Sequence, residues 1–171
     1  QPYNFSPYWR HVYLLPEAME NWGLVTFRES LLLYDEGSTT LFFKQLIAAV
    51  VAHEQAHMWF GNLVTCDWWS YAWLNEGFAS YFQYFATAKV ETGFDMEKQF
   101  VIDQAQVIMT MDATNSTNPL TDSASINTPE DLSRMFNSIS YFKGASVIRM
   151  VKHAMGEDNF RKSLQRYLKK K

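Results

Sequence analysis

His53-Glu54-Gln55-Ala56-His57 lies within an apolar segment that runs from Leu41 to Phe60 without an internal Gly or Pro. The segment is rich in strong helix formers and is followed by Gly61, so we expect a helix that stops at this glycine. Residues four apart on a helix lie on the same face, and the two histidines therefore stand one above the other. That face can hold a zinc ion.

A hydrolytic zinc site usually has three protein ligands and one open position for water. Glu76 is the natural third ligand, because it lies near the start of a second apolar helical segment, with eighteen residues between it and His57. Glu54 projects beside the ligand face, where it can act as general base toward a metal-bound water. A His-Glu-x-x-His pattern also arises by chance, and helical histidines are often satisfied core residues. The strong helix and the Glu76 that follows favour the metal site.

Four motifs together resemble the aminopeptidase N family of gluzincin metallopeptidases, which includes the membrane alanyl aminopeptidases. The motifs are His-Glu-Gln-Ala-His-Met-Trp-Phe-Gly-Asn (53–62), Trp-Leu-Asn-Glu-Gly-Phe-Ala (73–79), Ala-Met-Glu-Asn-Trp-Gly (18–23) and Ile-Ser-Tyr-Phe-Lys-Gly-Ala-Ser (139–146). The resemblance runs from about Leu15 to the C-terminus, and several segments look most like insect cell-surface members.

This resemblance implies an α+β, thermolysin-like fold with a small mixed β-sheet on the N-terminal side and a mostly helical body. It implies that residues 1–171 are a partial zinc aminopeptidase catalytic domain, truncated at both ends and lacking the flanking domains of the parent chain. It also implies a cofactor of one Zn²⁺ ion on His53, His57 and Glu76.

The resemblance further assigns a substrate-binding role to Glu20 and its neighbours Ala18, Met19 and Asn21. In the family, a carboxylate at the position of Glu20 grips the free α-ammonium group of the substrate. A carboxylate at a fixed distance from zinc accepts only a chain whose terminal charge ends there, which makes the enzyme an exopeptidase. The family motif begins with Gly where this chain has Glu17, and a side chain there can block close substrate approach.

Tyr141, in Tyr141-Phe142-Lys143-Gly144, matches the family pattern that supplies a catalytic tyrosine. A phenol hydroxyl can donate to the oxyanion that develops on the scissile carbonyl. The expected reaction is hydrolysis of the first peptide bond of a peptide with a free N-terminus, with the zinc-bound water activated by Glu54.

Two other functions stay open. A zinc endopeptidase would require that Glu20 does not bind an amine. A non-catalytic docking receptor at the cell surface, with foreign proteins or particles as partners, would need the protein's surface but no zinc.

Composition and charge narrow the possible settings. A net charge of −3 and the lack of a basic patch argue against a nucleic-acid partner. Lys44 interrupts the most hydrophobic helix, so no transmembrane segment is expected in this chain. Asn4 and Asn115 begin N-glycosylation acceptor patterns. Together with the family resemblance, they suggest a membrane-anchored parent protein whose catalytic domain faces the extracellular side of the plasma membrane.

The remaining segments have readable local structure. Alternating apolar residues within 24–34 predict two strands that turn near 28–30. Thr39 or Thr40 is the expected N-cap of the histidine helix, and Thr128 that of a later helix beginning at Pro129. The other expected helices span about 73–89, 94–113, 143–155 and 158–170, with a loop at 114–128.

Overall fold

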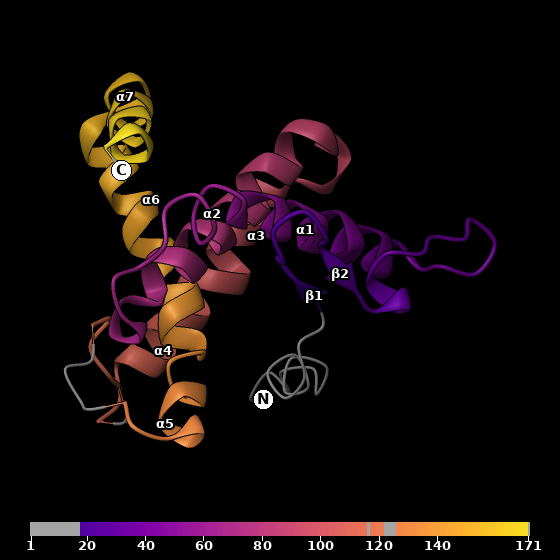
Figure 1. The fold of residues 1–171 in the computed structure, drawn as a ribbon. Coiled ribbons are helices and arrows are strands. Elements are labelled where there is room, and N and C mark those ends of the chain that lie inside the picture. Colours follow the sequence, from indigo (N-terminus) through magenta and orange to yellow (C-terminus); the bar gives the residue numbers. More distant parts are fainter. Residues whose placement is uncertain (1–17, 116, 122–125, 171) are drawn as a thin grey trace.

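The computed structural model describes residues 18–115, 117–121 and 126–170, and most of these residues are helical (Figure 1). The two longest helices among them, α1 (Leu41–His57) and α2 (Trp73–Val90), pack against each other. Helix α1 begins as expected, because the Thr40 hydroxyl accepts a hydrogen bond from the Phe43 N–H. It ends at His57 rather than at Phe60, since the following N–H groups bond back to carbonyls three residues earlier.

Helix α2 lies at the centre of the core. It packs against α1, α3 (Met96–Phe100), the π-helical segment η6 (Ile139–Lys143) and α6 (Gly144–Met155). The buried core residues are Ala49, Tyr81, Tyr84, Met96, Phe100, Ala145, Ile148 and Phe160. Tyr81 and Tyr84 belong to α2 itself and the other core residues pack around them, so α2 is fixed between α1, η6 and its other neighbours.

The observed sheet is smaller than the predicted one. Strands β1 (Ala18–Met19) and β2 (Thr26–Phe27) form an antiparallel pair with Ala18 opposite Phe27. The predicted second strand after Arg28 was wrong, because Glu29–Leu31 forms the 3₁₀ turn η2 instead, with Leu31 buried. The partner of β2 thus comes from the preceding segment, and no mixed sheet occurs within the described residues.

The C-terminal half is helical, as predicted. The segment expected as one helix over 94–113 follows the 3₁₀ turn η4 (Thr92–Phe94) and consists of α3, the π-helical η5 (Val101–Gln106) and α4 (Val107–Asp112). Helix α5 (Pro129–Ser133) starts with a complete capping box between Thr128 and Asp131. Helices α6 and α7 (Glu157–Lys169) follow, and Figure 1 shows α7 far from the β1–β2 pair.

None of the helices over these described ranges has the length and apolar character needed to cross a membrane.

Candidate metal centre and active site

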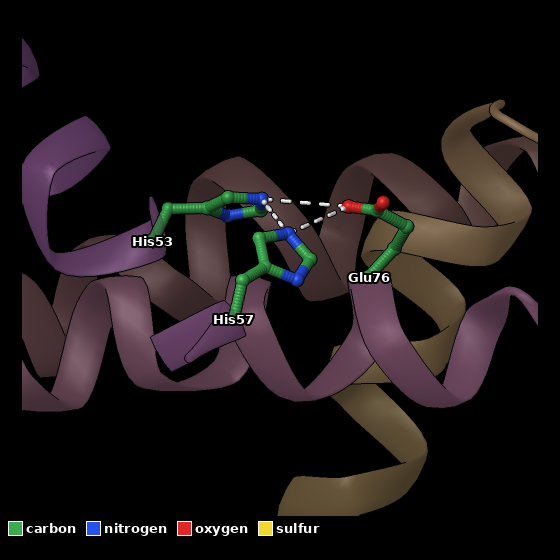
Figure 2. A group of neighbouring side chains, drawn as sticks. All are labelled: His53, His57 and Glu76. Carbon is green, nitrogen blue, oxygen red and sulfur yellow. Dashed lines mark hydrogen bonds and ion pairs between the residues drawn. The ribbon is translucent and has the colours of Figure 1, made fainter. Parts of the chain in front are cut away.

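His53, His57 and Glu76 point toward one another across the α1–α2 interface (Figure 2). The Nε2 atoms of the two histidines lie 3.1 Å apart. One carboxylate oxygen of Glu76, Oε2, lies 3.4 Å from each of them. The side chains of His53, His57 and Glu76 are only 11%, 2% and 7% exposed. The three groups that the sequence analysis named as metal ligands are therefore brought together in a largely buried cluster.

The spacing of these atoms fits a tetrahedral metal ion. A zinc ion about 2.0–2.1 Å from each nitrogen or oxygen ligand requires ligand atoms about 3.3–3.4 Å apart. The observed separations of 3.1, 3.4 and 3.4 Å are close to this requirement. Little ligand movement would be needed for these three residues to hold a metal.

Hydrogen bonds on the far side of each ring direct lone pairs into the cluster. His53 Nδ1 lies 3.1 Å from Gln83 Oε1, and His57 Nδ1 lies 2.9 Å from the Phe60 carbonyl oxygen. Both oxygens can only accept, so each Nδ1 carries the proton and donates it. Each Nε2 then presents a lone pair to the other and to Glu76. The lone pairs of the two Nε2 atoms and of Glu76 Oε2 converge on one point and repel one another unless a cation lies between them. Such a convergence of lone pairs is the arrangement that a metal site requires.

In the metal-free cluster, a proton supplies this positive charge. Burial alone would lower the pKa of His57, but the Glu76 carboxylate outweighs burial and raises that pKa to about 9. Burial would raise the pKa of Glu76, but the two histidines outweigh it and lower that pKa to about 2. Because His57 and Glu76 titrate as one coupled pair, a bound metal ion must displace this proton.

Glu54 is buried next to the cluster and lines the same cavity, but it does not share the ligand face of α1. Its Oε2 has no hydrogen-bond partner among the described residues. Burial raises the pKa of the Glu54 carboxyl, against the opposing effect of the two histidines. An unpaired buried carboxylate with a raised pKa, facing a cavity, is well suited to exchange protons with a bound molecule.

A cavity of about 920 Å³ opens over the cluster and is lined in part by β1. Ala18, Met19 and Glu20, which the resemblance assigns to substrate binding, are among the residues that line it. Glu20 Oε1 lies 3.9 Å from His57 Nδ1, and the Glu20 carbonyl accepts a 2.7 Å hydrogen bond from the Asn62 side chain. Asn21 differs from this expectation: it is exposed, lies outside the cavity lining and donates to the Thr26 hydroxyl across the hairpin.

Tyr141 lines the cavity from η6, and its ring stacks at 6.0 Å on the ring of His53. Two glycines bring its segment close to Glu76. A Cβ atom on Gly77 would lie 2.9 Å from the carbonyl carbon of Gly144, and one on Gly144 would lie 3.0 Å from Gly77 Cα. The backbones of α2 and of the η6–α6 junction are therefore in direct contact, which holds Glu76 and Tyr141 on the same cavity.

Gln83 is the site residue that sequence analysis missed. It lies seven residues after Glu76, two helical turns along the same face of α2, and this spacing is the signal that could have found it. Glu17, which stands where the family motif has Gly, and the N-glycosylation acceptor pattern at Asn4 lie outside the described residues. Asn115 is described and exposed, but Ser116 in its acceptor pattern is not described.

Comparisons of the sequence with known proteins show the family of the chain. The sequence model of the Peptidase family M1 domain matches residues 10–171, which is nearly the whole chain. The chain belongs to this family. Over 152 residues it is 48% identical to the membrane alanyl aminopeptidase of Manduca sexta, matching 89% of this chain and 15% of that protein.

Other M1 relatives are similar to the same degree. Identity is 50% to the membrane alanyl aminopeptidase of Heliothis virescens, over 89% of this chain and 15% of that protein. It is 48% to human aminopeptidase N, over 88% of this chain and 16% of that protein. The M1 chain described here thus spans about 15–16% of the length of these relatives.

Proposed function

We propose that the protein is a zinc-dependent aminopeptidase that hydrolyses the N-terminal peptide bond of peptides with a free amino terminus. The observation that carries this proposal is the convergence of His53, His57 and Glu76 at ligand spacing beside the unpaired Glu54 carboxylate. Membership of the M1 family and the names of the relatives support the same activity.

We assign the ligand roles to His53, His57 and Glu76, because their donor atoms have the separations that a tetrahedral ion requires. A zinc ion held there supplies Lewis acidity, which activates a water molecule and polarises the scissile carbonyl. Gln83 and the Phe60 carbonyl hold the two imidazoles in the tautomer that leaves both Nε2 atoms free to bind metal.

Glu54 takes the proton of the attacking water at its unpaired Oε2 and delivers it to the leaving amine. Its raised pKa suits both transfers, because a carboxyl closer to neutral pH accepts and returns a proton with less cost. Tyr141 donates its phenol hydrogen to the oxygen of the scissile carbonyl as negative charge develops there. The stacking of Tyr141 on His53 supports this role, because it keeps the phenol beside a ligand ring.

Glu20 accepts hydrogen bonds from the substrate's α-ammonium group. Its position 3.9 Å from His57 supports this assignment, because a charge gripped there leaves room for only one residue before the scissile bond. Ala18 and Met19, on the β1 wall of the cavity, contact the substrate main chain. We keep Asn21 only as a residue that supports the hairpin, since its side chain bonds to Thr26.

The fold and setting follow the same reasoning. We infer a thermolysin-like arrangement, which a mostly helical body beside a small sheet supports, and we infer that residues 1–171 contribute the metal-binding part of the catalytic domain. We place the catalytic domain on the extracellular face of the plasma membrane, with peptides as its substrates. The names of the insect relatives support a membrane setting.

The test compares alanine amide with N-acetylalanine amide as substrates of the full-length protein. We expect release of alanine only from the free amine, and loss of this activity when a zinc chelator is added. Glu20→Ala should lower kcat/KM for alanine amide at least tenfold while the protein retains its zinc, measured by atomic absorption. Cleavage of the acetylated substrate, or full activity of Glu20→Ala, would refute the aminopeptidase assignment.

A further inference from the structure

Asn62 links the end of α1 to the segment that carries Glu20, which lies 42 residues earlier in the chain. The backbone N–H of Asn62 donates to the carbonyl of His57 at 2.9 Å. Its side-chain amide nitrogen donates to the Glu20 carbonyl oxygen at 2.7 Å. One half-buried residue therefore contacts both a proposed metal ligand and the proposed amine-binding residue.

The turn that carries Asn62 is itself fixed. Gly61 has a φ of +143°, and a Cβ there would lie 3.1 Å from His57 Nδ1, so this position requires glycine. The Thr65 hydroxyl donates to the carbonyls of Gly61 and Asn62 at 2.7 and 3.3 Å. The Asn62 amide nitrogen also lies 3.6 Å from Met58 Sδ. These contacts limit the positions that the short Asn62 side chain can reach.

Glu20 depends on the Asn62 amide because the sheet does not extend to it. Within the described residues, the β1–β2 ladder includes Ala18 and Met19 and ends one residue before Glu20. The first carbonyl beyond the ladder is the one that accepts from Asn62. A carbonyl oxygen can only accept, so the nitrogen of the amide must face it. The hydrogen bond thus continues the hold on this segment where the ladder stops.

The same hydrogen bond sets where the Glu20 carboxylate can lie. Glu20 Oε1 is 3.9 Å from His57 Nδ1, and the Glu20 side chain is 21% exposed. An aminopeptidase requires a fixed distance between its amine site and its metal, because the ammonium group and the scissile carbonyl of one residue must reach both sites together. A misplacement of about 1 Å in such a constellation can reduce the rate about 10²-fold.

We propose that Asn62 is a positioning residue for the amine site, and that its hydrogen bond to the Glu20 backbone sets the distance between the Glu20 carboxylate and the metal ligands. This inference rests on the proposed aminopeptidase function, because Glu20 must bind the α-ammonium group of the substrate. Asn62 is not among the described residues that line the cavity, so it acts through Glu20 and not on the substrate itself.

The test measures the binding of two hydroxamates to the zinc-loaded full-length protein by calorimetry. Alanine hydroxamate and propionohydroxamate carry the same metal-binding group and differ only in the α-amine. The ratio of their Kd values therefore reports the amine contact and does not depend on turnover. A hydrogen bond to a charged group predicts that the wild type binds alanine hydroxamate at least about tenfold more tightly.

Two variants remove the hydrogen bond in different ways. Asn62→Asp keeps the size of the side chain but has no N–H to donate, and Asn62→Ala lacks the amide altogether. In both, the Kd ratio should fall about threefold to tenfold, whereas the Kd of propionohydroxamate should change less than about twofold. The zinc content should stay at the wild-type value. Asn159→Ala is the matched control, because it removes an exposed amide that donates to the Met155 carbonyl at 3.0 Å, and it should keep the wild-type ratio.

A double variant shows whether Asn62 acts through Glu20. Glu20→Gln alone should lower the Kd ratio. Adding Asn62→Ala to it should then change the ratio by less than about twofold, since the carboxylate that Asn62 positions is already absent. Independent, multiplying losses in the two variants would refute the proposed route of action.

An Asn62 variant that folds and keeps the wild-type ratio would overturn the proposal. An equal loss of affinity for both hydroxamates, or a loss of zinc, would also overturn it, because Asn62 would then only maintain the structure. Either variant decides if the other does not fold. A wild-type ratio near one would mean that Glu20 does not bind the amine, and the aminopeptidase proposal would fail with it. A large wild-type ratio that persists in the variants removes only the role of Asn62.

Discussion

The contact between Gly77 and Gly144 positions Glu76 relative to Tyr141, and Gly77→Ala is its most direct test. Two carbon atoms pack best about 3.5–4.0 Å apart. The added Cβ would lie 2.9 Å from the Gly144 carbonyl carbon. This neighbour is backbone and cannot rotate away, so α2 and the η6–α6 junction must separate by roughly 0.6–1.1 Å.

The stability change should be small, because two effects oppose each other. Overpacking costs about 1–3 kcal/mol, whereas Ala is favoured over Gly in a helix by about 0.8–1.0 kcal/mol. The free energy of unfolding should therefore fall by roughly 0–2 kcal/mol. Activity should suffer more, since a displacement of about 1 Å at a catalytic constellation can reduce the rate about 10²-fold.

The assay measures kcat for alanine amide, zinc content and thermal inactivation of the full-length protein. Gly93→Ala is the matched control, because a Cβ there meets no atom within 4 Å. It should keep wild-type kcat and change stability by less than about 1 kcal/mol. If Gly77→Ala hydrolyses alanine amide within twofold of the wild-type rate, the close approach does not position the catalytic groups and the reasoning fails.

Two further predictions concern the metal ligands. Gln83→Leu removes the hydrogen-bond acceptor of His53 Nδ1, so zinc affinity measured by competition with a chelator should fall about 10- to 100-fold. Gln83→Glu keeps an acceptor and should retain the wild-type affinity. Equal zinc affinities for the wild type and both variants would contradict this role of Gln83. In the metal-free protein, the raised pKa of His57 stabilises the fold fully below its ordinary value of 6.5, and this stabilisation is lost as pH rises toward about 9. The lowered pKa of Glu76 stabilises the fold above 4.5, and this contribution is lost only as pH falls toward about 2. Tm of chelator-treated protein should thus decline between about pH 6.5 and 9, and a Tm that is constant over this range would contradict the coupling.

The sequence was most informative where structure depends on local spacing. The four-residue interval between His53 and His57 places both rings on one face of any helix, and Thr40 and Thr128 cap their helices as predicted. The strand after Arg28 was wrong, because alternation in a short apolar segment does not distinguish a strand from a turn whose buried residue is Leu31. The π-helical turns η5 and η6 had no sequence signal, since their apolar pattern is that of an ordinary helix.

The sequence by itself determined the chemical groups available to this protein, namely two histidines on one helix face, a carboxylate beside them and a second carboxylate at the start of another helix. Only the tertiary structure decided that these groups meet, because distances between remote segments depend on packing that periodicity does not report. The backbone contact of Gly77 with Gly144 sets the approach of two helices, and the pairing of β1 with β2 forms the cavity wall that carries Glu20. The hydrogen bond from His53 to Gln83 likewise depends on the folded chain, and so does the cavity that Asp67 lines together with the metal cluster.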